Sequence, residues 1–198
     1  MRNIYFCFPG GKHKALTLSY DDGNIADRRL VEIFNRYGIK ATFNLNGGLN
    51  DKQDKVPVGE YAGLYGGHEI ACHTITHPTL ERCPADQVVL QVLEDRKILE
   101  KYTGYAVRGL AYPNGSYNSE IKSMLPSTGV RYARVVANSG SFSMPEDTME
   151  WRPTCHHDHD LDELAGQFLE LKKVQYLYLM YVWGHSYEFN NNDNWDII

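Results

Sequence analysis

The hydrophobic residues of this chain follow two alternating spacings. Short apolar runs are typical of buried strands, and apolar residues three or four positions apart are typical of amphipathic helices. The runs predict strands over residues 15–20, 41–45, 69–73, 105–112, 129–136 and 176–183. The helical spacings predict helices over residues 27–37, 58–65, 84–103, 118–125 and 161–171.

Capping residues mark the ends of two of these helices. Asn24 or Asp27 can cap the first helix, and Gly38 ends it. Pro84 suits the first turn of the third helix, because proline fits the beginning of a helix. The apolar stripe of that helix comprises Val88, Val89, Val92, Leu93 and Leu99.

The strands and helices alternate in one continuous series of six or more pairs, without an internal repeat or a linker. This pattern predicts an α/β barrel in a single domain that spans residues 1–198. Residues 190–195 resemble the polar start of a further helix, and residues 195–198 resemble its first turn. We therefore expect the chain to be truncated at its C-terminus.

Composition narrows the classes of protein and partner. Of the 198 residues, 42% are hydrophobic and 23% are charged, which is close to the average of globular proteins and excludes a disordered chain. The net charge is −5 and there is no basic run, so we expect neither nucleic acid nor a membrane as a partner. No apolar run approaches the ~20 residues that span a bilayer. None of these features indicates an oligomeric state.

Two features bear on the cellular location. Pro9 and Gly10 interrupt the short apolar patch at the N-terminus, so no signal-like segment forms there. The four cysteines are scattered without the spacing of a disulfide framework, which is typical of reduced thiols. Both features predict a cytoplasmic protein.

Two adjacent carboxylates follow the first predicted strand, in the sequence Ser-Tyr-Asp-Asp-Gly. Asp21 and Asp22 lie at the C-terminal end of this strand, the end at which parallel sheets and barrels form their sites. Neighbouring side chains on an extended segment point in different directions, so one acid can bind a metal while the other accepts a proton. Taken alone, Asp-Asp-Gly is also a common turn.

The stretch from Gly67 to Pro78 holds a second group of candidates. His73 and His77 are four residues apart at another strand end, and a helical turn there would place both imidazoles on one side. Two histidines and one carboxylate, here Asp22, form a recurrent catalytic metal site that leaves positions open for water. In a chain with eight histidines the same spacing can also arise by chance, with both residues structural.

Four motifs occur in the order seen in the polysaccharide deacetylase family, the NodB-homology enzymes that are also classed as family 4 carbohydrate esterases. The motifs are Ser-Tyr-Asp-Asp-Gly, His-Thr-Ile-Thr-His, Tyr-Pro-Asn-Gly and a late strand ending in Gly-His, and the resemblance covers residues 15–189. It implies a distorted (β/α) barrel, usually of seven strands, and one divalent metal ion, commonly zinc, with cobalt or nickel as alternatives. It also implies an acetylated saccharide as the substrate, from which N- or O-acetyl groups are removed.

The resemblance assigns the metal-binding and catalytic roles motif by motif. Asp21 resembles the catalytic base, and Asp22 resembles the metal-binding acid. His73 and His77 resemble the two metal-binding histidines. The base would accept a proton from the attacking water as it reaches the acetyl carbonyl.

Two later motifs supply the remaining catalytic groups. Asn114, which follows Tyr112 and Pro113, falls where a backbone N–H of the family helps to hold the oxyanion. His185 resembles the general acid, because an expelled amine must be protonated and an imidazole is a competent acid near neutral pH.

One position departs from the family pattern. The arginine that usually precedes the Pro-aromatic-Gly turn and orients the base is replaced by Ala111. Arg108 and Arg134 are equal candidates for that role, and either can instead be a surface residue.

The segment around the last cysteine allows two interpretations. In one, Trp151 with Asp147 loosely resembles the fourth family motif, and His156 or His157 contacts the substrate or supports the general acid. In the other, the segment is a loop and Asp158 or Asp160 caps the helix that follows. Because its ligands are consecutive, we expect Cys155-His156-His157 to form no metal site of its own.

Three functions are compatible with the sequence. The leading one is a metal-dependent carbohydrate deacetylase. The second is a hydrolase of another small amide or ester in the cytoplasm. The third is a non-catalytic carbohydrate-binding barrel, which would need no base, metal ligands and acid together.

Overall fold

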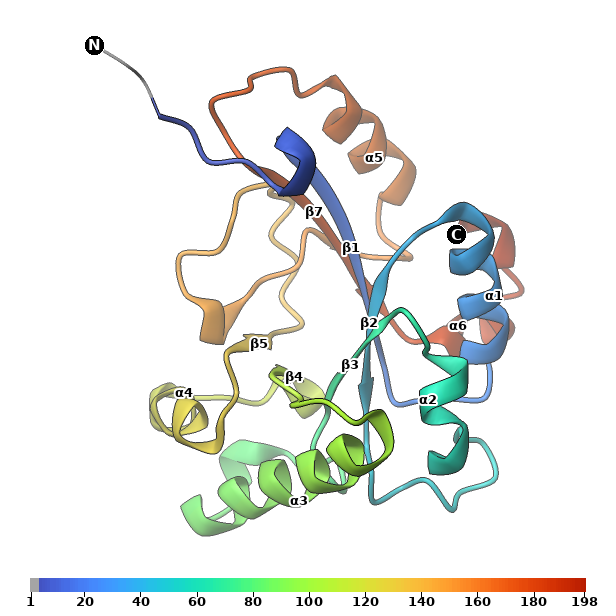
Figure 1. The fold of residues 1–198 in the computed structure, drawn as a ribbon, viewed down its shortest axis with the longest axis vertical. Helices are drawn as coiled ribbons and strands as arrows, with labels where there is room; N and C mark the ends of the chain where they lie inside the picture. The colour runs from blue at the N-terminus through green and yellow to red at the C-terminus, as the bar shows by residue number, and fades with distance from the viewer. Residues whose placement is uncertain (1–3) are drawn as a thin grey trace.

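The computed structural model describes residues 4–198 and contains seven parallel strands in one curled sheet (Figure 1). The strand order is β5-β4-β3-β2-β1-β7-β6, which confirms the prediction of a distorted barrel of about seven strands. The strands are β1 (Lys14–Asp21), β2 (Ala41–Leu45), β3 (Glu69–Cys72), β4 (Gly109–Ala111), β5 (Tyr132–Arg134), β6 (Cys155–His156) and β7 (Tyr178–Gly184).

The helices lie outside the curled sheet, with α1 beside α6 on one flank and α3 and α4 around the β4–β5 end (Figure 1). Within the described part of the chain, no helix combines the length and the apolar character needed to cross a membrane. The α-helices are α1 (Asp27–Tyr37), α2 (Tyr61–Leu64), α3 (Ala85–Thr103), α4 (Ser119–Met124), α5 (Leu161–Glu170) and α6 (Ser186–Asn192). Short 3₁₀ turns cover Pro9–Gly11, Val58–Glu60, Leu80–Arg82, Pro113–Gly115, Leu125–Thr128, Thr148–Glu150 and Trp195–Ile197.

The register of the strands brings the C-terminal end of each strand to the same rim. Asp21, the last residue of β1, pairs with Asn44 near the end of β2, and the preceding Tyr20 pairs with Gly184 at the end of β7. On the other side, Ala111 at the end of β4 pairs with Arg134 at the end of β5. Side chains that follow different strands therefore meet at one rim, as parallel sheets require.

Residues 151–156 connect the two edges of the sheet. The Trp151 N–H donates to the Ala133 carbonyl (2.9 Å), while the Thr154 N–H donates to the Tyr181 carbonyl (2.7 Å). The segment predicted to be only a loop thus includes the two-residue strand β6 and bridges β5 to β7. Its backbone N–H groups find acceptors on β5 and β7, which is why it is extended.

Two of the predicted helix features differ from the structure. The N-cap of α1 is Ala26, and no side chain caps the helix. The side chain of Asn24 accepts a hydrogen bond from the Ala26 N–H (3.0 Å), before the helix begins. Asp27 is the first residue of the helix, and its buried carboxylate accepts a hydrogen bond from the Tyr65 hydroxyl (2.7 Å). In α3, Leu93 is 40% exposed rather than part of the buried stripe. The buried face of α3 comprises Val88, Val92, Asp95 and Leu99.

The sequence analysis missed α6, which ends at Asn192, within the region 190–195 that was predicted to be the polar start of a later helix. Its sequence ends in three asparagines, residues that favour turns over helix interiors, so no helical spacing is visible. The helix is fixed by burial of Phe189 and by Glu188, whose carboxylate accepts the His185 N–H (2.9 Å). Past it, Trp195–Ile197 forms a single 3₁₀ turn.

Candidate active site

The three predicted metal ligands converge beyond the ends of β1 and β3. Oδ1 of Asp22 lies 3.9 Å from Nε2 of His73 and 3.9 Å from Nε2 of His77, and the three ligand atoms all lie within 4.8 Å of one another. Zinc bonds of about 2.0–2.1 Å would separate tetrahedral ligands by roughly 3.3 Å. A divalent ion therefore fits this group after small side-chain movements.

The orientation of His73 suits a metal ligand. Its Nδ1 lies 2.8 Å from the Ala111 carbonyl, which can only accept, so Nδ1 carries the proton and Nε2 presents a lone pair toward Asp22. Asp22 itself has a left-handed backbone (φ 79°) and lies 3.7 Å from the Lys55 ammonium. Lys55, which the sequence analysis did not single out, balances the charge of that carboxylate.

The segment that joins the two histidines is not the helical turn that we predicted. Thr74 and His77 both have left-handed backbones, with φ of 63° and 57°. The Asn46 amide donates to the carbonyls of His73 (2.6 Å) and Thr74 (2.9 Å), which holds the chain away from a helix. Pro78 also disfavours a helical residue before it. The two imidazoles still lie close together, edge to face, with ring centroids 4.7 Å apart.

Asp95 supports this segment from α3. Its carboxylate accepts the backbone N–H groups of Gly47 (2.6 Å) and His73 (3.1 Å), so it fixes the loop that carries the first histidine ligand. Burial raises the pKa of Asp95 to about 7, although these hydrogen bonds act to lower it. The sequence analysis missed Asp95, because a charged residue within Glu-Asp-Arg-Lys looks like part of an exposed helical face.

The buried carboxylate of Asp21 is paired with Arg134 and not with Arg108. One Nη of Arg134 forms an ion pair with Oδ2 of Asp21, and Asn44 donates to Oδ1 (2.8 Å). Burial alone would raise the pKa of Asp21, but Arg134, with His73 and His185, holds it below its ordinary value. Arg108 is exposed and donates to the Gly129 carbonyl (3.1 Å).

The strand register explains this pairing. Arg134 is the partner of Ala111 across β4 and β5, so the neighbouring strand supplies a guanidinium beside the position where the family pattern has one. Both members of the Asp21–Arg134 pair are almost fully buried, and the guanidinium also lies over the Trp183 ring, 4.7 Å from its centroid. Asp21 is therefore an ionised, rigidly held carboxylate beside the metal-ligand group.

His185 lies between β7 and α6 and is held by Glu188. Its Nδ1 is 3.2 Å from Oε1 of Glu188, and its backbone N–H donates to Oε2 (2.9 Å). Burial opposes the charged imidazole, but Glu188, Asp21 and Asp22 outweigh it and raise the pKa of His185. Despite its own burial, the pKa of Glu188 is well below its usual range, because His156 and His185 pair with it. Glu188 was not predicted from the sequence.

His156 and His157 both lie beside Glu188. Nε2 of His156 is 3.1 Å and Nε2 of His157 is 3.4 Å from Oε2 of Glu188. Burial lowers the pKa of His157 to about 4, and its ring stacks between Tyr20 and Phe189. The structure thus places both histidines beside the residue that holds His185.

The remaining predicted residues lie near the rim with mostly structural contacts. The Tyr112 hydroxyl donates to the Met149 carbonyl (2.8 Å), and Pro113 is buried. Asn114 is exposed with a left-handed backbone (φ 56°), and its side chain donates to Thr79 Oγ1 (3.2 Å). The Tyr-Pro-Asn-Gly turn follows directly on Ala111, whose carbonyl holds His73.

Trp151 and Asp147 do not reach the metal-ligand group. The Trp151 ring packs edge-on against Tyr181, with centroids 5.6 Å apart. Asp147 is exposed, pairs with Lys122 (2.6 Å) and caps a 3₁₀ turn. Asp160, one of the two residues predicted to cap the helix that follows, is the N-cap of α5. Its side chain makes no capping hydrogen bond.

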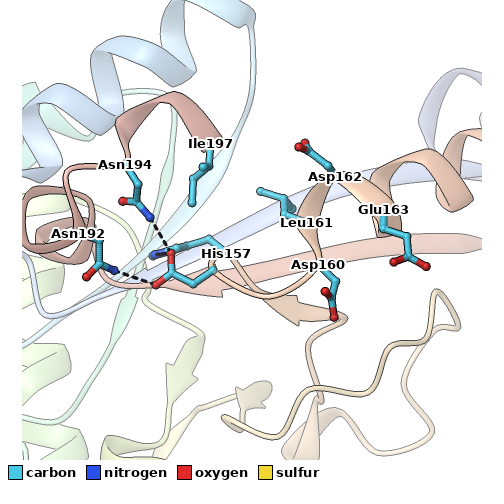
Figure 2. A pocket seen from close by; sticks show the side chains of 9 residues that line it. His157, Asp160, Leu161, Asp162, Glu163, Asn192, Asn194 and Ile197 are labelled. Atoms are coloured by element: carbon cyan, nitrogen blue, oxygen red, sulfur yellow. Dashed lines mark hydrogen bonds and ion pairs between the residues drawn. The ribbon is translucent and has the colours of Figure 1, made fainter.

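A cavity of about 560 Å³ lies behind His157, between the start of α5 and the residues after α6 (Figure 2). Asp22, His73 and His77 do not line this cavity, so we do not assign it as the catalytic cleft. Its lining comprises His157, Asp158, Asp160, Leu161, Asp162, Glu163, Asn192, Asn194 and Ile197.

Residues 9–133 match the family described as Polysaccharide deacetylase, which is more than half of the chain. This chain belongs to the polysaccharide deacetylase family. The match includes Asp21, Asp22, His73, His77 and Asn114 and ends just before Arg134. The other members of the site come from the last third of the chain.

Two curated relatives show how much of a family protein this chain represents. It is 29% identical over 113 residues to a peptidoglycan-N-acetylglucosamine deacetylase of Bacillus cereus, covering 56% of this chain and 40% of that protein. It is 30% identical over 110 residues to a chitooligosaccharide deacetylase of Rhizobium leguminosarum bv. phaseoli, covering 54% of this chain and 46% of that protein. The chain thus spans less than half the length of either family relative.

Solved structures show the same fold at lower identity. The deacetylase PplD of Streptococcus pyogenes, in complex with acetate, superposes with a TM-score of 0.62 at 22% identity, covering 66% of this chain and 59% of that one. A CE4-family pseudoenzyme of Bacillus anthracis superposes with a TM-score of 0.60 at 20% identity, covering 96% of this chain and 61% of that one. At these identities, the similarity between this chain and the two solved structures shows a shared fold and nothing more.

Proposed function

We propose that this chain removes acetyl groups from an N- or O-acetylated carbohydrate. One observation carries the proposal: the Asp22, His73 and His77 ligand group lies beside the buried Asp21 carboxylate, whose Oδ2 is 3.9 Å from Nε2 of His73. The two curated relatives, named as peptidoglycan and chitooligosaccharide deacetylases, favour an acetylated amino sugar as the substrate class.

A divalent metal ion, with zinc as our first choice, would be held by Asp22, His73 and His77. The ligands are one carboxylate and two imidazoles, a combination that zinc accepts with positions left open. Such an ion lowers the pKa of the attacking water and polarises the acetyl carbonyl.

Asp21 and His185 supply proton transfer on the two sides of the reaction. Arg134 keeps Asp21 ionised at neutral pH, so it can accept a proton from the attacking water. Glu188 raises the pKa of His185 and so favours the charged imidazole, which can give a proton to the leaving nitrogen or oxygen. The backbone N–H of Asn114 is our candidate donor to the oxyanion.

The intact residue set argues against a non-catalytic barrel. Carbohydrate binding alone requires neither an ionised base nor a protonated acid beside three metal ligands. The likeness to a pseudoenzyme concerns the fold, whereas the side chains named here decide the chemistry.

The test is acetate release from a panel of acetylated mono- and oligosaccharides by zinc-loaded protein. We expect release from at least one sugar, and none above background from the matched variant Asp22→Ala. Saccharide binding without acetate release, by protein shown to hold zinc, would instead support the non-catalytic barrel.

A further inference from the structure

His156 lies against the carboxylate that holds the proposed general acid. Its Nε2 is 3.1 Å from Oε2 of Glu188, while Oε1 of the same carboxylate is 3.2 Å from Nδ1 of His185. The three residues come from separate elements, since His156 belongs to β6, His185 follows β7 and Glu188 lies in the first turn of α6. The carboxylate therefore contacts two imidazole rings, one with each oxygen.

We propose that His156 is a positioning residue for the general acid: its ring donates to Glu188 and holds that carboxylate against His185. The inference rests on the proposed function, in which His185 gives a proton to the leaving group. His156 itself takes no part in that transfer. Because its side chain is only 11% exposed, the geometry favours support of the acid over contact with the substrate, the other role that the sequence allowed.

The backbone fixes the place of the ring proton of His156. The Asp158 N–H donates to Nδ1 (3.2 Å), and since a backbone N–H can only donate, Nδ1 offers its lone pair. The proton then lies on Nε2, the nitrogen beside Glu188. His156 is thus a neutral donor to the carboxylate, and the negative charge of Glu188 stays available to the imidazole of His185.

Strand β6 and Trp183 hold the ring of His156 in place. His156 pairs with Trp183 in the register of β6 and β7, two residues before His185. The Trp183 ring lies edge-on to the ring of His156, with centroids 4.7 Å apart, and its own N–H donates to Asn138 (2.8 Å). The two-residue strand β6 therefore places a fixed donor beside the residue that holds the acid.

Glu188 gains both orientation and charge from this donor. Its side chain is 24% exposed, and a glutamate side chain with access to water has several rotamers open to it. Contact with His156 on one oxygen leaves the other oxygen turned toward His185. Burial would raise the pKa of Glu188, but hydrogen bonding by His156, followed by that of His185, holds the pKa well below its usual range.

NMR of the histidine ring nitrogens tests the pairing without turnover. In the wild type at neutral pH, we expect His156 to carry its proton on Nε2 alone, and the loss of the signal in His156→Gln assigns it. The proton on Nδ1 of His185 should also be visible, because contact with Glu188 protects it from exchange with water. It should remain in His156→Gln, whose side-chain amide can still donate, and disappear in His156→Met, which has no donor.

Rates on two substrates test the role in catalysis. With zinc-loaded protein, amide deacetylation should fall by about 10-fold in His156→Met, a part of the roughly 10²–10⁴-fold that general acid catalysis contributes. Hydrolysis of an activated aryl acetate should change little, because its phenol leaves without a proton. His156→Gln should keep most of the amide activity. So should the matched control His159→Met, which removes an exposed histidine three residues along the chain.

A proton on Nδ1 of His156 would overturn the proposal, as would a His185 signal that survives in His156→Met. Equal rates for His156→Met and His156→Gln, or equal losses on the two substrates in His156→Met, would overturn it as well. The proton position in the wild type decides even if His156→Met does not fold. If the wild type releases no acetate from any sugar, the proposed function fails, and the ring signals still decide whether His156 holds Glu188.

Discussion

Glu188 holds His185 by both its backbone and its ring. One carboxylate oxygen accepts the His185 N–H at 2.9 Å, and the other lies 3.2 Å from Nδ1. The first contact fixes the start of α6, and the second stabilises the charged imidazole, so position and protonation of the proposed acid depend on one residue. The proposed general acid thus depends on a side chain three positions further along the chain.

Replacing Glu188 by glutamine should move the alkaline limb of the pH–rate profile to lower pH. The carboxylate raises the pKa of His185, so its loss lets the imidazole give up its proton at a lower pH, and the rate then falls earlier as pH rises. The measurement is kcat/KM against pH for amide deacetylation at one equivalent of zinc. Glu163→Gln, on α5, is the control and should leave the limb in place. An unshifted limb in Glu188→Gln would show that the charge of Glu188 does not set the pKa of the rate-determining acid.

Removal of the metal should abolish acetate release and its return should restore it. Chelation followed by one equivalent of zinc or cobalt should recover the activity of the wild type, because the three-ligand group is open and refillable. Asp22→Ala and His77→Ala should regain little, since each lacks one ligand. Full recovery of both variants at the same metal concentration would show that the ion binds elsewhere.

Loss of Arg134 should destabilise the fold far more than loss of Arg108. Arg134→Met leaves the Asp21 carboxylate buried without its partner, which lowers the free energy of unfolding by about 3–5 kcal/mol. Arg108→Ala removes an exposed side chain and should change it by less than about 0.5 kcal/mol. Urea unfolding at neutral pH measures both variants. Similar losses in the two would contradict the assignment of Arg134 to Asp21.

Asp95→Asn should weaken metal binding although Asp95 touches no predicted ligand atom. An amide in its place presents N–H donors to the backbone N–H groups of Gly47 or His73, so the histidine loop loses a fixed position. We expect about a 10–100-fold loss of zinc affinity at the Asp22 group, the usual effect of removing such support. Asp86→Asn, exposed at the start of the same helix, is the matched control. Equal affinities in the two variants would refute the role.

The fold and the convergence of Asp22, His73 and His77 could be predicted because their signals are local. Each strand and helix has its own apolar spacing, and the acids and histidines follow single strands in contiguous motifs. The loop between His73 and His77 was mispredicted, because its shape depends on the amide of Asn46, a residue from the neighbouring strand end.

The missed residues share a dependence on long-range contacts. The choice of Arg134 over Arg108 depends on the register that pairs Ala111 with Arg134, which spacing along the chain does not reveal. Glu188 lies in a helix without apolar periodicity, and Asp95 is a charged residue on a buried helix face. Burial of a charge is decided by what packs against it, and no single segment carries that information.

The central claim is that this chain hydrolyses an acetyl group with His185 as the acid for the leaving group. An amine cannot leave unprotonated as an anion, whereas the phenol of an activated aryl acetate leaves with little help. In His185→Ala, amide deacetylation should fall by about 10²–10⁴-fold, the usual contribution of general acid catalysis. On the same preparation at one equivalent of zinc, hydrolysis of the aryl acetate should fall much less, because the metal ligands and Asp21 remain. Equal losses on the two substrates would contradict the claim and assign His185 to binding or structure.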